Sequence, residues 1–174
     1  MFFSTIGPEI VLEPDRDKLL TADDSTLADF CSIEAFVGTG PGGQHRNRNY
    51  TAVRIRLKNY RNIVAEESSF RSQKQNLSAA LNKLRLEIAL SCRKSYPENC
   101  VYTHLNENNP LYACEFAKLL DAAVQCNFDH KKAAELTGLS ASKFLKELAR
   151  DYRVWTEFQA ARAELGLSEL KKPR

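Results

Sequence analysis

The sequence has 174 residues, of which 43% are hydrophobic and 27% charged, with a formal net charge of +3 at pH 7. This composition is typical of a soluble globular protein with one domain or two small ones, and no apolar run is long enough to span a bilayer, so we expect no membrane partner. The five cysteines are widely spaced without a C-x-x-C pair, which favours reduced thiols in the cytoplasm over disulfides or a metal site.

The charged residues are unevenly distributed along the chain. Residues 1–30 carry two basic and seven acidic side chains, a net charge of −5, whereas residues 31–109 carry twelve and six, a net charge of +6. Residues 110–174 carry eleven and nine, a net charge of +2. A positive middle segment suits a polyanion such as RNA, although a solvated basic surface has the same composition.

The first segment, residues 1–22, contains proline and aspartate and shows no clear hydrophobic period. We predict an N-terminal arm or cap here. We expect no signal peptide, because a basic start followed by a sustained apolar stretch is missing. Asp23 to Ser25 then predict the start of a short helix that ends at Phe30, with Leu27 and Phe30 on its inner side.

An α+β domain is predicted over residues 23–95. Strands are expected over 32–37 and 51–57, on either side of a glycine-rich segment. In the second strand apolar and basic side chains alternate, which is the period of a half-buried strand. The apolar positions are Val53, Ile55 and Leu57, and the basic positions are Arg54 and Arg56.

A turn over 58–62 and a return strand over 63–65 complete a small antiparallel sheet. The next segment, 72–93, has leucine and isoleucine at helical spacing, so we predict one long helix that packs on the sheet. Its apolar positions are Leu77, Leu81, Leu84 and Ile88.

The C-terminal part is predicted to be wholly helical. Residues 96–109 are polar and contain Pro97, which indicates a linker, and residues 110–174 form a helical module. Four helices are expected, over 111–126, 129–137, 140–150 and 154–165.

Within this module, Gly138 and Ser140 separate the second and third helices in the pattern of a helix-turn-helix. If the third helix contacts nucleic acid, Lys143 and Lys146 would make the contact; a plain helix-packing module is the alternative. Trp155 and Phe158 are expected in its core.

The glycine-rich segment reads GTGPGGQHRNRNY from Gly38 to Tyr50 and holds four of the seven glycines. A phosphate-binding P-loop is excluded, because Gln44 and His45 follow the last glycine in place of Lys and Ser or Thr, and a strand rather than a helix comes next. An independent hydrolase is disfavoured as well, because no G-x-S-x-G motif is present and no acidic residue lies beside His45 to orient its ring.

A third interpretation treats the segment as a probe inserted into an RNA site. Gly42 and Gly43 permit positive φ or close approach to another molecule, and the backbone N–H of Gln44 can stabilise a developing oxyanion. The following side chains suit phosphate binding. They are Arg46, Asn47, Arg48 and Asn49.

The sequence resembles the class I peptide chain release factors, in their GGQ domain. GTGPGGQHRNRNYTAVRIRL resembles the family's Gly-Gly-Gln loop with its following Asn, basic residue and Ala-Val-Arg strand. RSQKQN at 71–76 resembles the family's Arg-Ser-Gln…Asn motif at the start of its long helix. The resemblance covers about residues 24–93.

The resemblance implies that the Gly-Gly-Gln tip enters the ribosomal peptidyl transferase centre and promotes attack of water on the ester of peptidyl-tRNA. Gly42, Gly43 and Gln44 would then be the catalytic residues, and Gln44 a site of methylation by a glutamine methyltransferase. Partners would be the ribosome, peptidyl-tRNA and ribosomal RNA, with no cofactor and no metal. The residues implied to contact ribosomal RNA or tRNA are His45, Arg46, Asn47, Arg48, Arg54, Arg56, Arg71, Gln73 and Lys74.

Two departures from the family shape the expected function. Only about 30 residues precede the glycine-rich segment, and no stop-codon-reading region is recognisable, so we expect codon-independent release or rescue of stalled ribosomes. The chain also ends in Lys171-Lys172-Pro173-Arg174 without the long basic tail of short rescue factors, and its layout resembles bacterial release-factor-like proteins with a helical extension. A non-catalytic ribosome- or RNA-binding module and a DNA-binding helix-turn-helix regulator are the alternatives.

Overall fold

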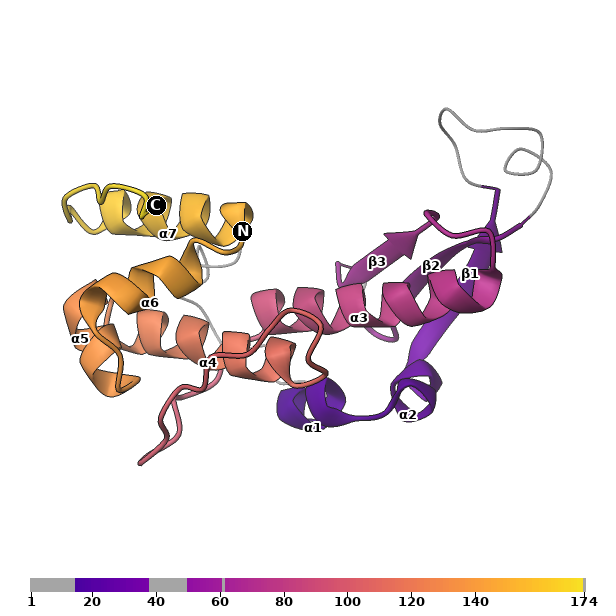
Figure 1. Cartoon of the computed structure of the whole chain (residues 1–174), viewed down its shortest axis with the longest axis horizontal. Coiled ribbons are helices and arrows are strands. Elements are labelled where there is room, and N and C mark those ends of the chain that lie inside the picture. Colours follow the sequence, from indigo (N-terminus) through magenta and orange to yellow (C-terminus); the bar gives the residue numbers. More distant parts are fainter. Residues whose placement is uncertain (1–14, 38–49, 61, 174) are drawn as a thin grey trace. The chain divides into compact units, whose positions relative to one another are not determined.

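The computed structural model describes residues 15–37, 50–60 and 62–173 (Figure 1). The chain divides into two compact units. We call the unit within Glu13–Ile88 the sheet unit and the unit within Ala89–Arg174 the helical unit. The predicted α+β class with a helical C-terminal part is confirmed.

Three antiparallel strands in the order β1-β2-β3 form the sheet of the sheet unit. They are β1 (Cys31–Phe36), β2 (Ala52–Leu57) and β3 (Val64–Glu67). The central strand β2 pairs with both neighbours, so that Ile55 lies opposite Ile33 on one side and Ala65 on the other. The turn between β2 and β3 places Asn59 at φ 67°, a left-handed conformation that asparagine tolerates better than most residues.

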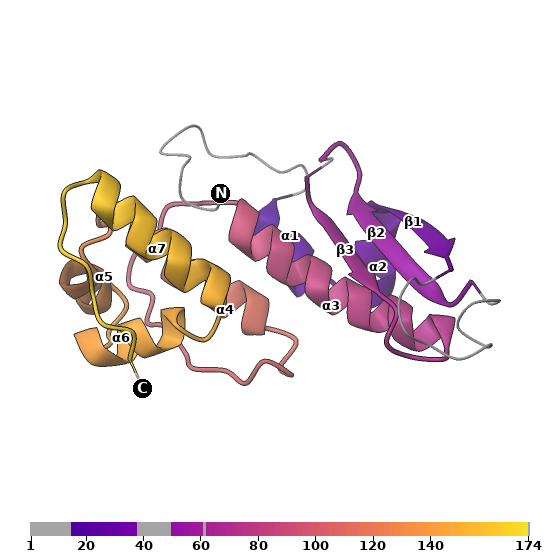
Figure 2. The same ribbon diagram turned by 90° about the horizontal axis from the view of Figure 1, so that it is seen from above.

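Helix α3 (Gln73–Ser91) lies along the sheet, as Figure 2 shows for the sheet unit. The predicted alternation in β2 is confirmed, because Val53, Ile55 and Leu57 are all at most 3% exposed. On α3 the predicted inner positions are buried except for Leu77, which is half-buried. Burial of each such side chain contributes about 1.5–3 kcal/mol, so this contact forms the core of the sheet unit.

A helix occupies part of the segment that the sequence analysis assigned to an arm. α1 (Arg16–Thr21) begins after Asp15, whose carboxylate accepts a hydrogen bond from the Asp17 N–H at 2.9 Å. Leu19 and Leu20 are each 1% exposed. A helix of this length shows too little periodicity to be recognised in sequence, which explains why it was not predicted.

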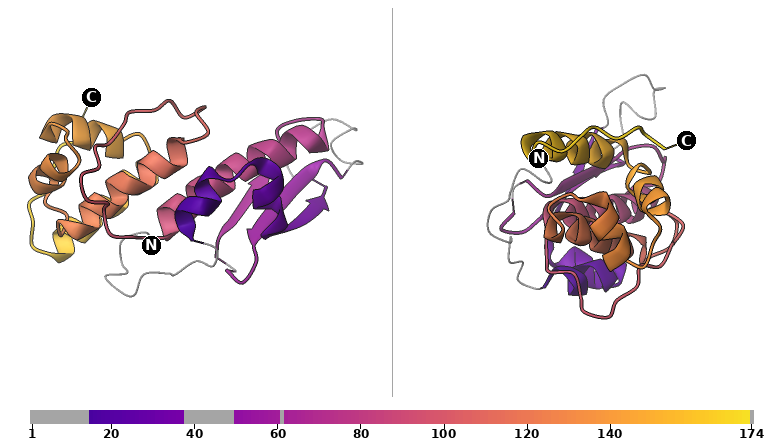
Figure 3. Two further views of the ribbon diagram at one scale, coloured as in Figure 1. Left: turned by 90° about the horizontal axis from the view of Figure 1, so that it is seen from below. Right: turned by 90° about the vertical axis from the view of Figure 1, so that its left-hand side faces the viewer.

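The second short helix, α2 (Asp24–Asp29), has the predicted bounds (Figure 3). The Asp23 carboxylate caps it by accepting a hydrogen bond from the Thr26 N–H at 2.8 Å. Leu27 is fully buried as expected, but Phe30 is 37% exposed, so the prediction that Phe30 faces inward is wrong. Phe30 is the C-cap residue, and it donates its N–H back to Leu27 in a turn that leads into β1.

The helical unit contains the four predicted helices. They are α4 (Tyr112–Gln125), α5 (His130–Leu136), α6 (Ala141–Leu148) and α7 (Tyr152–Glu164). Ser140 caps α6 as predicted, and Gly138 and Gly166 follow α5 and α7 at φ 71° and 70°. Glycine adopts this left-handed conformation without strain, which is why it terminates helices.

Phenylalanine rings fill the core of the helical unit. The Phe128 and Phe158 rings meet edge to face with centroids 6.0 Å apart. Trp155 is 6% exposed and Phe158 fully buried, so their predicted place in the core is confirmed. None of the helices in the described part of the chain has the length and apolar character needed to cross a membrane.

The segment 96–109 is irregular, as predicted, yet it is attached to the helical unit. Tyr96 and Tyr102 are 5% and 4% exposed, and the Tyr102 hydroxyl donates a hydrogen bond to Glu147 on α6 at 2.9 Å. Its role as a linker between domains stays a prediction.

Candidate functional site

The glycine-rich segment connects β1 to β2. Its predicted catalytic residues Gly42, Gly43 and Gln44 lie outside the described residues, as do His45, Arg46, Asn47 and Arg48. The structure describes both flanks: β1 ends at Phe36 and β2 begins at Ala52, and these two residues are paired in the sheet. The segment therefore leaves and rejoins the sheet at adjacent positions.

Arg54 lies on the sheet face opposite α3, between two carboxylates. Its Nε donates to Glu66 Oε1 at 2.5 Å, and its Nη1 lies 3.5 Å from Glu34 Oε2. Both glutamates are its direct partners across the strands. The hydrogen bond that Arg54 donates to Glu66, together with the negative charges of Glu66 and Glu34, raises the pKa of Arg54. Its charge is thus largely offset by its two neighbours on this face of the sheet.

Arg56 is two residues further along β2 and has different neighbours. Its partners across the strands are Ser32 and Val64, neither of which is acidic. Arg56 is exposed, and no carboxylate among the described residues pairs with it. Of the two arginines predicted on β2, Arg56 is the one whose charge faces solvent.

A second group of predicted residues lies at the start of α3. Arg71, Gln73 and Lys74 are all exposed, and none of the three pairs with a carboxylate of the described residues. Arg71 lies in the connection over residues 68–72 that joins β3 to α3, and Gln73 and Lys74 are the first two residues of the helix.

Glu67, which the sequence analysis did not select, holds this connection. Its Oε1 accepts hydrogen bonds from the Ser68 N–H, the Ser69 N–H and the Ser69 hydroxyl at 2.7–2.9 Å, and its Oε2 pairs with Lys83 at 2.9 Å. Burial to 8% exposure would raise its pKa, but the bonds from Ser69 and Lys83 lower the pKa of Glu67 to about 2.

Asn76 is the second residue that the sequence analysis did not select, although it ends the RSQKQN motif. Its fully buried side chain accepts from the Phe70 N–H at 2.9 Å and donates to Phe70 O at 2.9 Å and Thr51 O at 2.6 Å. Asparagine is a poor residue for a helix, so its presence in the first turn was the available signal. Asn76 joins the start of β2 to the start of α3.

The lysines proposed for the helix-turn-helix lie on the surface of α6. Lys143 and Lys146 are exposed, and neither pairs with an acidic side chain in the described part of the chain. The inner side of α6 buries Phe144 and Leu148 completely. The structure brings these lysines together on one exposed face of the helix.

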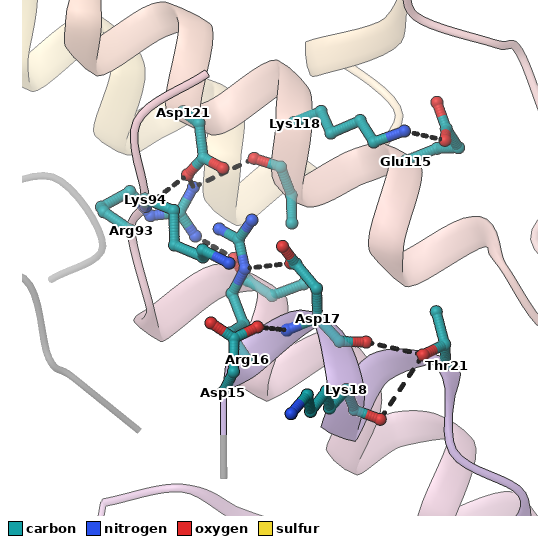
Figure 4. Close-up of polar contacts among 12 residues, drawn as sticks. Asp15, Arg16, Asp17, Lys18, Thr21, Arg93, Lys94, Glu115, Lys118 and Asp121 are labelled. Carbon is teal, nitrogen blue, oxygen red and sulfur yellow. Dashed lines mark hydrogen bonds and ion pairs between the residues drawn. The ribbon is translucent and has the colours of Figure 1, made fainter. Parts of the chain in front are cut away.

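By contrast, most acidic groups of the helical unit are engaged within it. Asp121 accepts from Arg93 at 3.3 Å and from the Lys94 N–H at 3.0 Å (Figure 4). Glu147, with its side chain 6% exposed, accepts from Tyr102 and Arg150 and pairs with His104 at 2.7 Å. These carboxylates support packing and do not offset the lysines of α6.

The described residues contain no cluster of three or more histidine, cysteine or acidic side chains that would hold a metal ion. All five cysteines are free thiols.

Comparison with known proteins gives one result. Residues 27–107, just under half of the chain, match the family model described as the RF-1 domain. The match includes the glycine-rich segment, the whole sheet, α3 and the segment that follows it. Neither the curated proteins nor the solved structures that were searched contain a match.

Proposed function

We propose that the chain promotes codon-independent hydrolysis of peptidyl-tRNA on the ribosome, because residues 27–107 match the RF-1 domain model. The observation that carries this proposal is the family match with Gly42-Gly43-Gln44 inside the matched range. The exposed, unpaired cations of the same matched range, Arg56, Arg71 and Lys74, support it, because the ribosome presents a phosphate-rich surface.

In the proposed reaction, water attacks the carbonyl carbon of the ester, and the bond to the terminal ribose oxygen of the tRNA breaks. The products are a free peptide carboxylate and a tRNA with its ribose hydroxyl restored. Gln44 would position the water, and its backbone N–H would stabilise the oxyanion of the tetrahedral intermediate. The ribosome and the tRNA supply the remaining groups, which accounts for a sequence without its own base and nucleophile.

We rank the proposed RNA contacts by whether a carboxylate of the protein already pairs with the residue. Arg56, Arg71 and Lys74 are exposed and unpaired among the described residues, and Gln73 lies between the latter two. Arg54 is the weaker candidate for an RNA contact, because Glu34 and Glu66 already pair with it. His45, Arg46, Asn47 and Arg48 complete the proposed contact set from the sequence.

The experiment measures peptide release from stalled ribosomal complexes. Wild type should release the peptide, and Gln44→Ala or Gly43→Ala should lose at least about tenfold in rate at saturation, in line with loss of an oxyanion donor or of the backbone shape that presents it. Asn108→Ala removes an exposed amide elsewhere and should release peptide at the wild-type rate. Binding without release by the wild type would instead identify a non-catalytic ribosome-binding module.

The exposed lysines of α6 favour a second contact. We propose that Lys143 and Lys146 bind the backbone of structured ribosomal RNA, because they form an unpaired cationic face on a rigid helix. The double variant Lys143→Glu and Lys146→Glu should weaken ribosome binding and leave the unfolding temperature unchanged. Unchanged ribosome binding would refute this contact, and selective binding of wild type to duplex DNA at physiological salt would favour a DNA-binding regulator.

A further inference from the structure

Two exposed aromatic residues lie at or next to the backbone groups that the Asn76 side chain binds. Tyr50 is 67% exposed and Phe70 is 45% exposed. Asn76 Nδ2 donates to the carbonyl of Phe70 at 2.9 Å and to the carbonyl of Thr51, the residue after Tyr50, at 2.6 Å. Because one nitrogen binds both carbonyls, the chain at Tyr50–Thr51 and the chain at Phe70 lie side by side.

The segment that carries Phe70 is held mainly through its backbone groups. Asn76 binds both the N–H and the carbonyl of Phe70, and Glu67 binds the N–H groups of Ser68 and Ser69. The ring of Phe70 is therefore left outside the core, on a rigid support. A single exposed aromatic ring needs no explanation, but two rings on neighbouring, anchored chains form a distinct surface.

Two exposed cationic residues follow Phe70 closely in the chain. Arg71 follows Phe70 directly, Lys74 lies in the first turn of α3, and both are exposed without an acidic partner in the described ranges. Aromatic rings interleaved with unpaired cations are the recognition chemistry of single-stranded nucleic acid. The rings stack on bases and the cations bind the adjoining phosphates.

We propose that Tyr50 and Phe70 form a stacking platform for unpaired RNA nucleotides, with Arg71 and Lys74 as its phosphate contacts. Asn76 is its positioning residue, since it fixes the spacing between the two chains that carry the rings. The inference rests on the proposed function only in assigning the natural ligand to the ribosome or its tRNA. Stacking itself does not require peptide release.

The test uses the full chain and short single-stranded oligoribonucleotides that carry a fluorescent purine analogue, whose emission falls when its base stacks. Wild type should bind and quench the probe, and should prefer it over a duplex, whose bases are already stacked. The double variant Tyr50→Leu and Phe70→Leu should lose roughly tenfold in affinity per ring and lose the quenching. The affinity of this variant should depend on salt concentration as steeply as that of the wild type, because no charge has been removed.

Matched variants separate stacking from charge and from folding. Tyr152→Leu removes a ring that is 70% exposed in the helical unit and should bind as wild type. Arg71→Gln with Lys74→Gln should reduce the salt dependence and keep the quenching of bound probe. Asn76→Ala should weaken binding although both rings remain. Because this variant also removes buried hydrogen bonds and so lowers stability, the two leucine substitutions are the decisive test of stacking.

Wild-type affinity and quenching in the double leucine variant would overturn the platform, as would failure of wild type to bind single strands. A chain that binds and quenches the probe but releases no peptide would refute the proposed function and leave the platform standing. If the wild type releases peptide and the leucine variant binds the probe as tightly as the wild type, the platform is refuted and the proposed function is not.

Discussion

Arginine has opposite surroundings in the two units. In the helical unit, Arg162 is 4% exposed and donates to the carbonyls of Phe128 and Ser168 at 2.5 and 2.8 Å, and Arg150 lies over the Tyr112 ring and binds Glu147. In the sheet unit, Arg56 and Arg71 are exposed without a carboxylate partner in the described residues. These two pairs of arginines carry the same charge, but only Arg56 and Arg71 offer it to a polyanion.

This difference shows why net charge alone does not identify a binding surface. Buried arginines such as Arg162 satisfy carbonyls within the protein, so they stabilise the fold. Exposed cations without a carboxylate partner, such as Arg56 and Arg71, can bind phosphate without first breaking an internal ion pair. Each of the following variants tests one side of this contrast.

The largest effect is expected from the unpaired cations of the sheet unit. The triple variant Arg56→Ala, Arg71→Ala and Lys74→Ala should lower affinity for stalled ribosomes by about tenfold per lost phosphate contact at ~0.1 M salt. The slope of log affinity against log salt should fall by about three, whereas the thermal unfolding temperature should stay within a few degrees of wild type. An unchanged slope would place the ribosome contacts elsewhere.

Next in size is the loss of a buried arginine in the helical unit. Arg162→Met keeps the apolar stem but leaves the carbonyls of Phe128 and Ser168 without their donor, so the free energy of unfolding should fall by about 2–4 kcal/mol. The single tryptophan, Trp155, lies in this core and reports the transition by fluorescence. Arg153→Met, whose side chain is 49% exposed, is the control and should cost well under ~1 kcal/mol.

Glu67 gives a smaller and pH-dependent effect. Its folded pKa of about 2 lies below the ordinary value of 4.5, so its stabilisation is complete above pH 4.5 and is lost as the pH falls toward 2. Glu67→Gln should therefore lower the free energy of unfolding by about 1–3 kcal/mol at pH 7 and by much less near pH 2. Denaturant titrations of both proteins at the two pH values measure this, and an equal difference at both would show that the carboxylate charge is irrelevant.

The smallest effect is expected at Arg54. Arg54→Met breaks the cross-strand pairs with Glu34 and Glu66, which should lower the free energy of unfolding only slightly because these ion pairs are exposed to solvent, and it should leave the salt dependence of ribosome binding unchanged. Arg56→Met in the same strand should leave the free energy of unfolding unchanged and reduce the salt dependence of ribosome binding. A reduced salt slope for Arg54→Met would show that this arginine leaves its carboxylates to bind phosphate, as the family resemblance implied.

Local patterns in the sequence predicted most of the fold. The alternation in β2, the spacing of Leu81, Leu84 and Ile88, and the Ser140 cap each depend on residues close together in the chain, and each was confirmed. Helix α1 was not predicted because its apolar pair, Leu19 and Leu20, is too short to define a period.

The candidate site was harder to predict, because its determinants depend on contacts between distant segments. Arg54 looked equivalent to Arg56 until the register placed Glu34 and Glu66 beside it from two other strands. Glu67 and Asn76 hold backbone groups, whose need for partners cannot be seen in a sequence. The catalytic role assigned to Gln44 still depends on family resemblance, since this residue lies outside the described ranges.

The pairing of Phe36 with Ala52 has a consequence for how such a protein can change. The two strands are already in register before the glycine-rich segment begins and after it ends, so the sheet does not depend on what joins them. We therefore expect that a change of length within residues 38–49 leaves the pairing of β1 with β2 intact.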